Sequence, residues 1–387
     1  MRIPIRQFSH TTGHQSQQRH KSPLSPNPDQ QLPRHAPVSD LQLSKINIHL
    51  TLAPPEHDER QNIEITQAID KLQEAMTEAD CDNSALISVL TDPKFQDQQA
   101  LHQFQYDYYS QTTLDLAEQI EQKTQGLFRA ALMALLKGPL DYDVYTLEKA
   151  LSGEDADKRA LNNVLLCRSS ANIRGIIRKY NGTSGRDLVE LIKSKVDKDL
   201  FRLYSIIFSD TRIEDAVLDI PTNIPTEIDD KVAEIQRLIE SPPTTDFTPI
   251  IDILASANAA QLRAMSSAYE KKYQRKLDHD IARKFYGSSM EDALLQILDF
   301  ATDRGKSDAD GLWNVLRPST KNDNTFIYRA LRLYWSGTER LQEVHAAYKK
   351  TYGMRLLDNL NGSLSGHYRK LMIALYGEKS TPTSMYR

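Results

Sequence analysis

The chain has 387 residues, of which 40% are hydrophobic and 26% are charged, and its formal net charge at pH 7 is −4. A chain of this length can bury the cores of two ordinary domains or the continuous core of a repeat array. The negative charge argues against a protein that binds nucleic acid through global positive charge, so we expect no nucleic-acid partner. Its two cysteines, Cys81 and Cys167, are too few for a disulfide framework, and they make no zinc site without histidine partners.

Residues 1–60 differ in composition from the rest of the chain. They are rich in Gln, Ser, Pro and His and show no sustained periodicity, which predicts a disordered tail, available to a protein partner. This segment has no long apolar core of a secretory signal, and no later apolar run reaches the roughly 20 residues that a spanning helix needs. We therefore expect a cytoplasmic protein whose membrane contacts are peripheral. Export without a standard signal peptide is equally compatible with this composition.

From Ile63 onward the pattern turns helical, and it repeats four times. Apolar residues recur seven and four residues before, and eight and twelve residues after, each of four tyrosines. Spacings of three and four place the earlier pair on one helical face that ends at the tyrosine, and the later pair belongs to a second helix. We interpret all these positions as core, because stacked repeats bury faces that a single repeat cannot. The four tyrosines are Tyr108, Tyr180, Tyr269 and Tyr348.

Strand signals are nearly absent, so the expected fold class is all-α. Pro221 and Pro225 interrupt the pattern between the second and third repeats, and we expect the polar segment Arg304–Asp310 to separate the third repeat from the fourth. The predicted organisation is a tail at 1–60, repeats at 62–138, 139–212, 228–303 and 304–377, a linker at 213–227, and a C-terminal tail at 378–387.

Three stretches of the sequence resemble the annexin family. They run from Gly138 to Leu151, from Arg168 to Tyr180 and from Tyr348 to Leu375, and the resemblance as a whole covers roughly residues 62–377. It implies an annexin-like array of four five-helix repeats that forms a slightly curved disc. It also implies a convex face whose loops bind calcium and phospholipid head groups.

The calcium-ligand positions implied by that resemblance are altered here. In an annexin repeat, backbone carbonyls of a Gly-x-Gly-Thr loop hold the calcium together with a carboxylate about forty residues later, since calcium prefers six to eight oxygen ligands. An ammonium has no lone pair to offer, and it repels a divalent cation. We therefore expect no standard metal site and at most weak calcium binding. The carboxylate position falls fifteen residues after each tyrosine, where this sequence has Lys123, Lys195, Lys284 and Ser363.

The glycine loops are altered too, and the loop at Gly153 is altered least. In the first two repeats the glycine loop contains acids, while the carboxylate position carries a lysine. We hypothesise that the lysine ammonium replaces calcium as the cation that bridges the two loops, or that the acids hold a metal. Alternatively, Lys123, Lys195 and Lys284 face anionic head groups directly, or they are ordinary solvated lysines. The acids are Glu78, Asp80 and Asp82 in the first loop and Glu154, Asp155 and Asp157 in the second.

These observations predict a peripheral membrane protein that binds anionic phospholipid surfaces with a weakened or non-standard dependence on calcium. The alternative is a scaffold or cytoskeleton-associated interaction protein that has the same fold and has lost calcium and lipid binding. The sequence contains no phosphate-binding glycine loop, no nucleophile elbow and no zinc helix motif, so we do not expect an enzyme.

Overall fold

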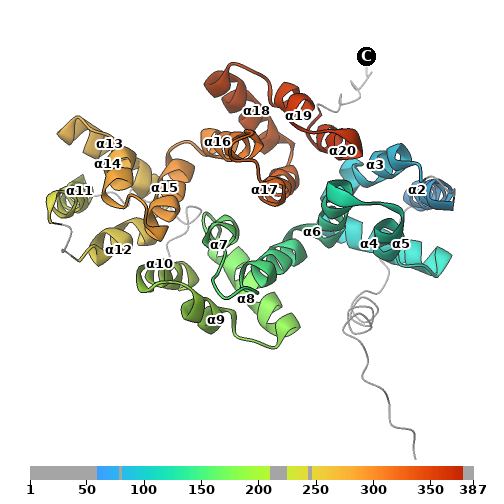
Figure 1. The fold of residues 1–387 in the computed structure, drawn as a ribbon, viewed down its shortest axis with the longest axis horizontal. Coiled ribbons are helices and arrows are strands. Elements are labelled where there is room, and N and C mark those ends of the chain that lie inside the picture. Colours follow the sequence, from blue (N-terminus) through green and yellow to red (C-terminus); the bar gives the residue numbers. More distant parts are fainter. Residues whose placement is uncertain (1–58, 78–80, 210–224, 243–245, 378–387) are drawn as a thin grey trace, which may run out of the picture. The chain divides into compact units, whose positions relative to one another are not determined.

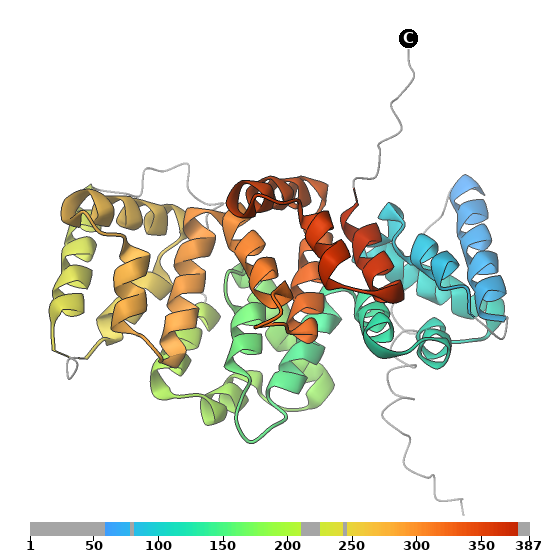
Figure 2. The same cartoon turned by 45° about the horizontal axis from the view of Figure 1, so that its top comes forward.

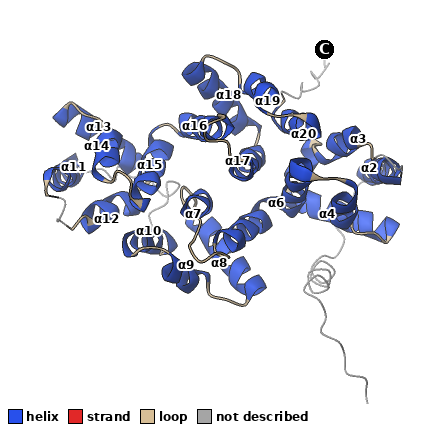
Figure 3. Cartoon of the chain, in the orientation of Figure 1, coloured by secondary structure: helices blue, strands red, loops and turns tan. Residues whose placement is uncertain are grey.

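The computed structural model describes residues 59–77, 81–209, 225–242 and 246–377. These ranges contain the α-helices α2 to α20 and one short 3-10 helix at Pro93–Gln96, and no strand occurs within them (Figures 1 and 3). The all-α fold class is therefore confirmed. Most of the predicted N-terminal tail, residues 213–224 of the predicted linker and the predicted C-terminal tail lie outside the described residues.

The helices form four groups of five, which we call repeats 1 to 4, with α6 shared between the first two. Repeat 1 has α2 (Glu59–Thr77), α3 (Asn83–Leu90), α4 (Gln98–Thr112), α5 (Leu116–Lys123) and the first half of α6 (Gly126–Ala150). Repeat 2 has the rest of α6, α7 (Lys158–Leu165), α8 (Ser170–Ser184), α9 (Leu188–Lys195) and α10 (Lys198–Phe208). Repeat 3 has α11 (Pro225–Glu240), α12 (Thr248–Ser256), α13 (Ala259–Tyr273), α14 (Leu277–Lys284) and α15 (Ser289–Thr302). Repeat 4 has α16 (Arg304–Leu316), α17 (Asp323–Trp335), α18 (Thr338–Tyr352), α19 (Leu356–Ser363) and α20 (Gly366–Tyr376).

A kink at Gly138 lets α6 serve two repeats. Gly138 has a φ of 73°, in the left-handed region that favours glycine, and the following Pro139 has no amide hydrogen for an internal helix bond. A Cβ atom on Gly138 would lie 3.2 Å from the Gln98 side chain, so the position is also closely packed. The predicted boundary between residues 138 and 139 falls at this kink.

The third and fourth helices keep one register in all four repeats. Each third helix has 15 residues, with the tyrosine at the same place in each, and each fourth helix has 8 residues. The four tyrosines are at most 1% exposed. The apolar positions around them are buried with one exception, the half-buried Leu341, which confirms that the repeated pattern forms the core.

The segment Arg304–Asp310, which we predicted to be a break, forms the first turns of α16. Its glycine and polar residues favour a loop by intrinsic propensity, but contacts from outside the segment override that preference. The Asp303 carboxylate accepts a hydrogen bond of 2.9 Å from the Lys306 amide and caps the helix. Arg340 of α18 donates to the Arg304 carbonyl at 2.6 Å. The prediction was wrong because neither contact can be read from the segment itself.

Packing joins repeat 1 to repeat 4 in the same way as repeat 2 to repeat 3. The last helix of repeat 4, α20, packs against α3 and α6, and the last helix of repeat 2, α10, packs against α12 and α15 (Figures 1 and 2). The buried apolar residues of all four repeats belong to one hydrophobic cluster. The two junctions are therefore equivalent places in the fold, and their side chains can be compared position by position.

Candidate functional site

Two loops of each repeat carry the residues that the sequence singled out. We call the segment between the first and second helices the first loop, and the segment between the fourth and fifth helices the fourth loop. The predicted carboxylate positions are the last residues of the fourth helices, directly before the fourth loops. A lysine at that place is also stabilised by the negative end of the helix dipole, by about 0.3–1 kcal/mol. The first loops are residues 78–82, 151–157, 241–247 and 317–322, and the fourth loops are 124–125, 196–197, 285–288 and 364–365.

In repeat 2 the Lys195 ammonium reaches the first loop. Its Nζ donates to the Gly153 carbonyl oxygen at 2.5 Å, across 42 residues of sequence. Glu154 and Asp155 are exposed, and no ion pair between described residues joins either of them to Lys195. The ammonium therefore contacts a backbone carbonyl where our hypothesis placed a carboxylate.

In repeat 3 the Lys284 ammonium contacts the end of α11 and both ends of the first loop that follows it. Its Nζ donates to the Ile239 carbonyl at 2.9 Å and to the Ser241 carbonyl at 2.6 Å. It also lies 4.5 Å from the centroid of the Phe247 ring. A cation over an aromatic face contributes about 0.5–1 kcal/mol at an exposed site. Lys284 thus joins the two ends of the first loop to the end of α14.

In repeat 4 the ammonium comes from the first loop and not from the end of the fourth helix. Ser363 stands at the carboxylate position, and its hydroxyl donates to Oδ1 of Asn359 at 2.8 Å. Lys321 of the first loop donates from Nζ to the Ser363 carbonyl at 3.3 Å. Lys321 was not among the predicted site residues. Its signal in the sequence was its separation of 42 residues from Ser363, the same as that between Gly153 and Lys195.

Repeat 1 is described in part, since the predicted residues Glu78 and Asp80 lie outside the described residues. Asp82 caps α3 by accepting hydrogen bonds of 2.9 and 3.1 Å from two amides of its first turn. Burial raises the pKa of the Cys81 thiol, the Lys123 ammonium opposes this rise, and Asp82 adds to it. Lys123 therefore acts electrostatically on Cys81 of the first loop.

The acid at the start of α7 also acts as a helix cap, because Asp157 accepts a hydrogen bond of 3.0 Å from the Ala160 amide. Carboxylates are stabilised at helix starts by free amides and by the helix dipole. Asp82 and Asp157, which we predicted as metal ligands or salt-bridge partners, therefore have a structural role. No group of three or more His, Cys, Asp or Glu in the described ranges could hold a metal. Since Lys195 and Lys284 occupy loop carbonyls, the donor sets of repeats 2 and 3 do not fit a calcium ion.

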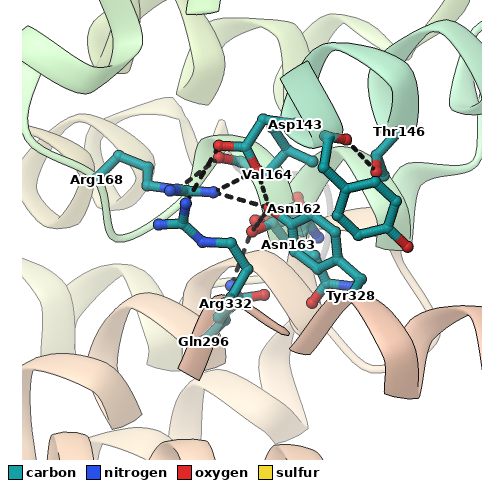
Figure 4. A network of polar contacts seen from close by, with 10 residues as sticks. Asp143, Thr146, Asn162, Asn163, Val164, Arg168, Gln296, Tyr328 and Arg332 are labelled. Carbon is teal, nitrogen blue, oxygen red and sulfur yellow. Dashed lines mark hydrogen bonds and ion pairs between the residues drawn. The ribbon is translucent and has the colours of Figure 1, made fainter. Parts of the chain in front are cut away.

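A buried polar network joins repeat 2 to repeat 4 (Figure 4). Arg168 donates from Nη2 to Asp143 at 2.9 Å and to the Tyr328 hydroxyl at 2.7 Å, and that hydroxyl donates to the same carboxylate oxygen at 2.7 Å. Arg332 adds a longer contact of 3.4 Å to Asp143. Burial raises the pKa of Asp143 to about 6, against the opposing effects of Arg168 and Tyr328. Burial thus favours the neutral carboxyl group, while the Arg168 guanidinium and the Tyr328 hydroxyl favour the ionised one.

Sequence comparisons agree with this architecture. A family model described as Annexin matches residues 142–205, 232–297 and 336–375, which lie in repeats 2, 3 and 4. Annexin A11 of Mus musculus is 27% identical over 308 residues, which cover 79% of this chain and 58% of that relative. Annexin A4 of Homo sapiens is 26% identical over 307 residues, which cover 79% of this chain and 92% of that relative. The chain thus spans little more than half the length of annexin A11.

Solved structures show the same fold. A point mutant of annexin A8 with an intact N-terminus matches with a TM-score of 0.74 at 22% identity, over 84% of this chain and 97% of that chain. Calcium-bound alpha-14 giardin matches with a TM-score of 0.69 at 20% identity, over 81% and 99%. The matched family model, the relatives and the repeated five-helix architecture together support membership of this chain in the annexin family.

Proposed function

We propose that this protein binds anionic phospholipid surfaces peripherally, with lysine ammonium groups taking the place of calcium between its first and fourth loops. The proposal is carried by one observation: Lys195, Lys284 and Lys321 each donate to a carbonyl of the facing segment in repeats 2, 3 and 4. These are the loops to which the family resemblance assigns calcium and head groups. A cation that belongs to the chain would keep the loops together without a metal ion.

Two apolar side chains stand beside the fourth loops. Tyr286, in the fourth loop of repeat 3, is 85% exposed, and Leu127, just after the fourth loop of repeat 1, is 37% exposed. A tyrosine at a membrane interface places its ring among the head groups while its hydroxyl stays hydrated. Cations combined with exposed apolar side chains suit an anionic lipid surface. None of the described helices is long and apolar enough to cross a bilayer.

A weak dependence on calcium is part of the proposal. Calcium-bound annexin (Sm)1 and calcium-bound alpha-14 giardin are among the structures with this fold, each at 20% identity, and their calcium concerns those proteins. In this chain an ammonium stands at three of the four carboxylate positions. Calcium binding would have to displace that ammonium or occur elsewhere. We therefore propose that membrane binding persists when calcium is removed.

Sedimentation with phosphatidylserine vesicles, with calcium or with a chelator, tests this function. We expect the protein to pellet with the vesicles under both conditions, because the loop cations are part of the chain. Pelleting with calcium alone would contradict the proposed independence from calcium. No pelleting under either condition would contradict the membrane function and favour the alternative, an interaction protein or scaffold that acts through residues 1–60 or another surface.

Replacing both Leu127 and Tyr286 by serine is expected to weaken vesicle binding about tenfold, since burying such side chains is worth on the order of 1–2 kcal/mol. Sedimentation over a range of lipid concentrations measures the change. The matched control replaces Leu114 and Tyr109, which are 43% and 41% exposed. Tyr109 lies in the last turn of α4, and Leu114 lies in the segment between α4 and α5. The 8 residues of α5, about 12 Å in length, separate that segment from the fourth loop. Equal losses in the two double variants would contradict the assignment of the fourth loops to the membrane.

A further inference from the structure

A pocket of about 600 Å³ lies where repeats 2, 3 and 4 meet. Its lining comes mainly from α7 of repeat 2, α15 of repeat 3, and α16 and α17 of repeat 4 (Figure 1). Pockets of roughly 300–1,000 Å³ are typical of small-molecule sites. Among the described residues, six arginines and four aspartates line this pocket. The arginines are Arg159, Arg168, Arg304, Arg317, Arg329 and Arg332.

Arg329 stands at a position that is apolar in the other repeats. It is the seventh residue after the N-cap of α17, and the second helices of repeats 1, 2 and 3 have Val89, Val164 and Leu254 at that place. These three side chains are at most 6% exposed. A charged group at such a packed position loses hydration, which is unfavourable unless a counter-charge compensates the loss. Burial accordingly lowers the pKa of Arg329.

The groups that hold Arg329 are neutral. Its Nε and Nη2 donate to Oδ1 of Asn163 at 3.1 and 2.9 Å, and its Nη1 donates to the Gly311 carbonyl at 2.7 Å. A Cβ atom on Gly311 would lie 2.6 Å from Nη1, so the glycine leaves room for the guanidinium. A guanidinium has five N–H groups, so these contacts leave one N–H on Nη1 and one on Nη2. No carboxylate among the described residues forms an ion pair with Arg329, although Asp292 and Asp308 act on it through space.

Arg304, at the start of α16, is a second guanidinium without an ion pair in the described part of the chain. Burial and the neighbouring Arg340 lower the pKa of Arg304, against the opposing effect of Asp308. Asp308 acts on both Arg304 and Arg329, but its carboxylate accepts its hydrogen bonds from Nε and Nη2 of Arg340, at 3.1 and 2.6 Å. Even with Glu343, which also pairs with Arg340, three guanidinium groups have two carboxylates here.

The other three aspartates of the lining lie beside cations of their own. Asp310 pairs with Lys306 at 2.5 Å, and Asp292 lies 3.9 Å from Arg159. Burial raises the pKa of Asp299 to about 6, and Lys306 opposes this rise. The lining therefore keeps an excess of positive charge beside the fourth aspartate.

We propose that this pocket binds a phosphate group of a soluble molecule, with Arg304 and Arg329 as its cationic partners. A phosphate monoester carries a charge of about −1.5 to −2 at pH 7, which matches two guanidinium groups better than a single carboxylate does. Guanidinium groups also bind phosphate oxygens through two parallel hydrogen bonds. Arg304 lies about 18 Å along α16 from the first loop of repeat 4, so a lipid head group that stays in the bilayer does not reach it. The site is therefore independent of the proposed membrane function.

Calorimetric titration with inorganic pyrophosphate, at an ionic strength kept constant with sodium chloride, tests the site. We expect saturable binding to the wild-type protein, and we expect Arg329→Leu to weaken it at least roughly tenfold, because the change removes a charge-assisted contact. Leucine is the residue that repeat 3 has at this position, so it suits the packing. Arg304→Gln should weaken binding to a similar degree. Arg237→Gln removes a positive charge from an exposed position on α11, which does not line the pocket, and should leave binding unchanged.

A purely structural role for Arg329, as a link between Asn163 and Gly311, predicts a different result. The wild-type protein would then not titrate with pyrophosphate, or Arg304→Gln and Arg237→Gln would titrate equally, and either outcome would overturn the site. Arg304→Gln keeps the test decisive if Arg329→Leu does not fold, because the Arg304 side chain donates no hydrogen bond to the described residues. A protein that titrates with pyrophosphate but does not pellet with phosphatidylserine vesicles would contradict only the membrane function.

Discussion

Replacing Asp143 by alanine is expected to lower the free energy of unfolding by about 3–5 kcal/mol, because the change leaves the Arg168 guanidinium buried without its counter-charge. The side chains of Asp143 and Arg168 are 3% and 5% exposed, and their ion pair of 2.9 Å is completed by the Tyr328 hydroxyl. Tyr328 belongs to repeat 4, so the loss should also weaken the contact between repeats 2 and 4. Urea unfolding followed by circular dichroism measures the change.

An exposed pair between repeats provides the matched control. Arg159 and Asp292 are 3.9 Å apart and 63% and 69% exposed, so Asp292→Ala should cost less than about 1 kcal/mol. A double variant with Asp143→Leu and Arg168→Met tests the cause, because it removes both charges at once. We expect it to recover most of the stability lost by Asp143→Ala. A double variant as unstable as the single one would show that the unpaired guanidinium is not the source of the cost.

The sequence predicted the helices best where short-range periodicity determines them. The third and fourth helices begin and end at the same distances from Tyr108, Tyr180, Tyr269 and Tyr348. Their apolar spacing is complete within a few turns, so a single repeat contains the whole signal. The start of α16 depends instead on Arg340, which lies 36 residues beyond Arg304. Local composition therefore indicated a break where the chain continues as a helix.

The sequence predicted where the candidate site lies, but it predicted only some of the contacts that the site residues make. Spacing located Lys195 and Lys284, but their partners are backbone carbonyls, which every residue has and which no composition can identify. Asp82 and Asp157 carried a signal that competes with the ligand interpretation, since an aspartate directly before an apolar helical segment is a typical N-cap. The network at Asp143 joins residues up to 189 apart in the chain, and no local pattern predicts it.

The altered carboxylate positions would account for the proposed weak calcium binding only if the residue at that position opposes the ion. Lys195→Glu tests this, because it replaces the cation that contacts the Gly153 carbonyl by an acid. At about 4 Å in water, a unit charge and a divalent cation interact by about 2 kcal/mol, so exchanging a positive for a negative charge favours calcium by about 4 kcal/mol. We therefore expect the affinity for calcium to rise roughly a thousandfold, as measured by calorimetric titration of the metal-free protein.

Lys193→Glu makes the same change of charge on the same helix and serves as its control. Lys193 is 55% exposed and pairs with Glu190 at 3.4 Å, one turn earlier on α9, so it makes no contact with Gly153 among the described residues. Its replacement should raise the affinity for calcium little, because exposed charges far from an ion are screened by salt. If Lys195→Glu and Lys193→Glu gave the same affinity for calcium, the change in net charge would explain the gain. A gain confined to Lys195→Glu would mean that the residue at the carboxylate position, and not the loss of the glycine loop, limits calcium binding in repeat 2.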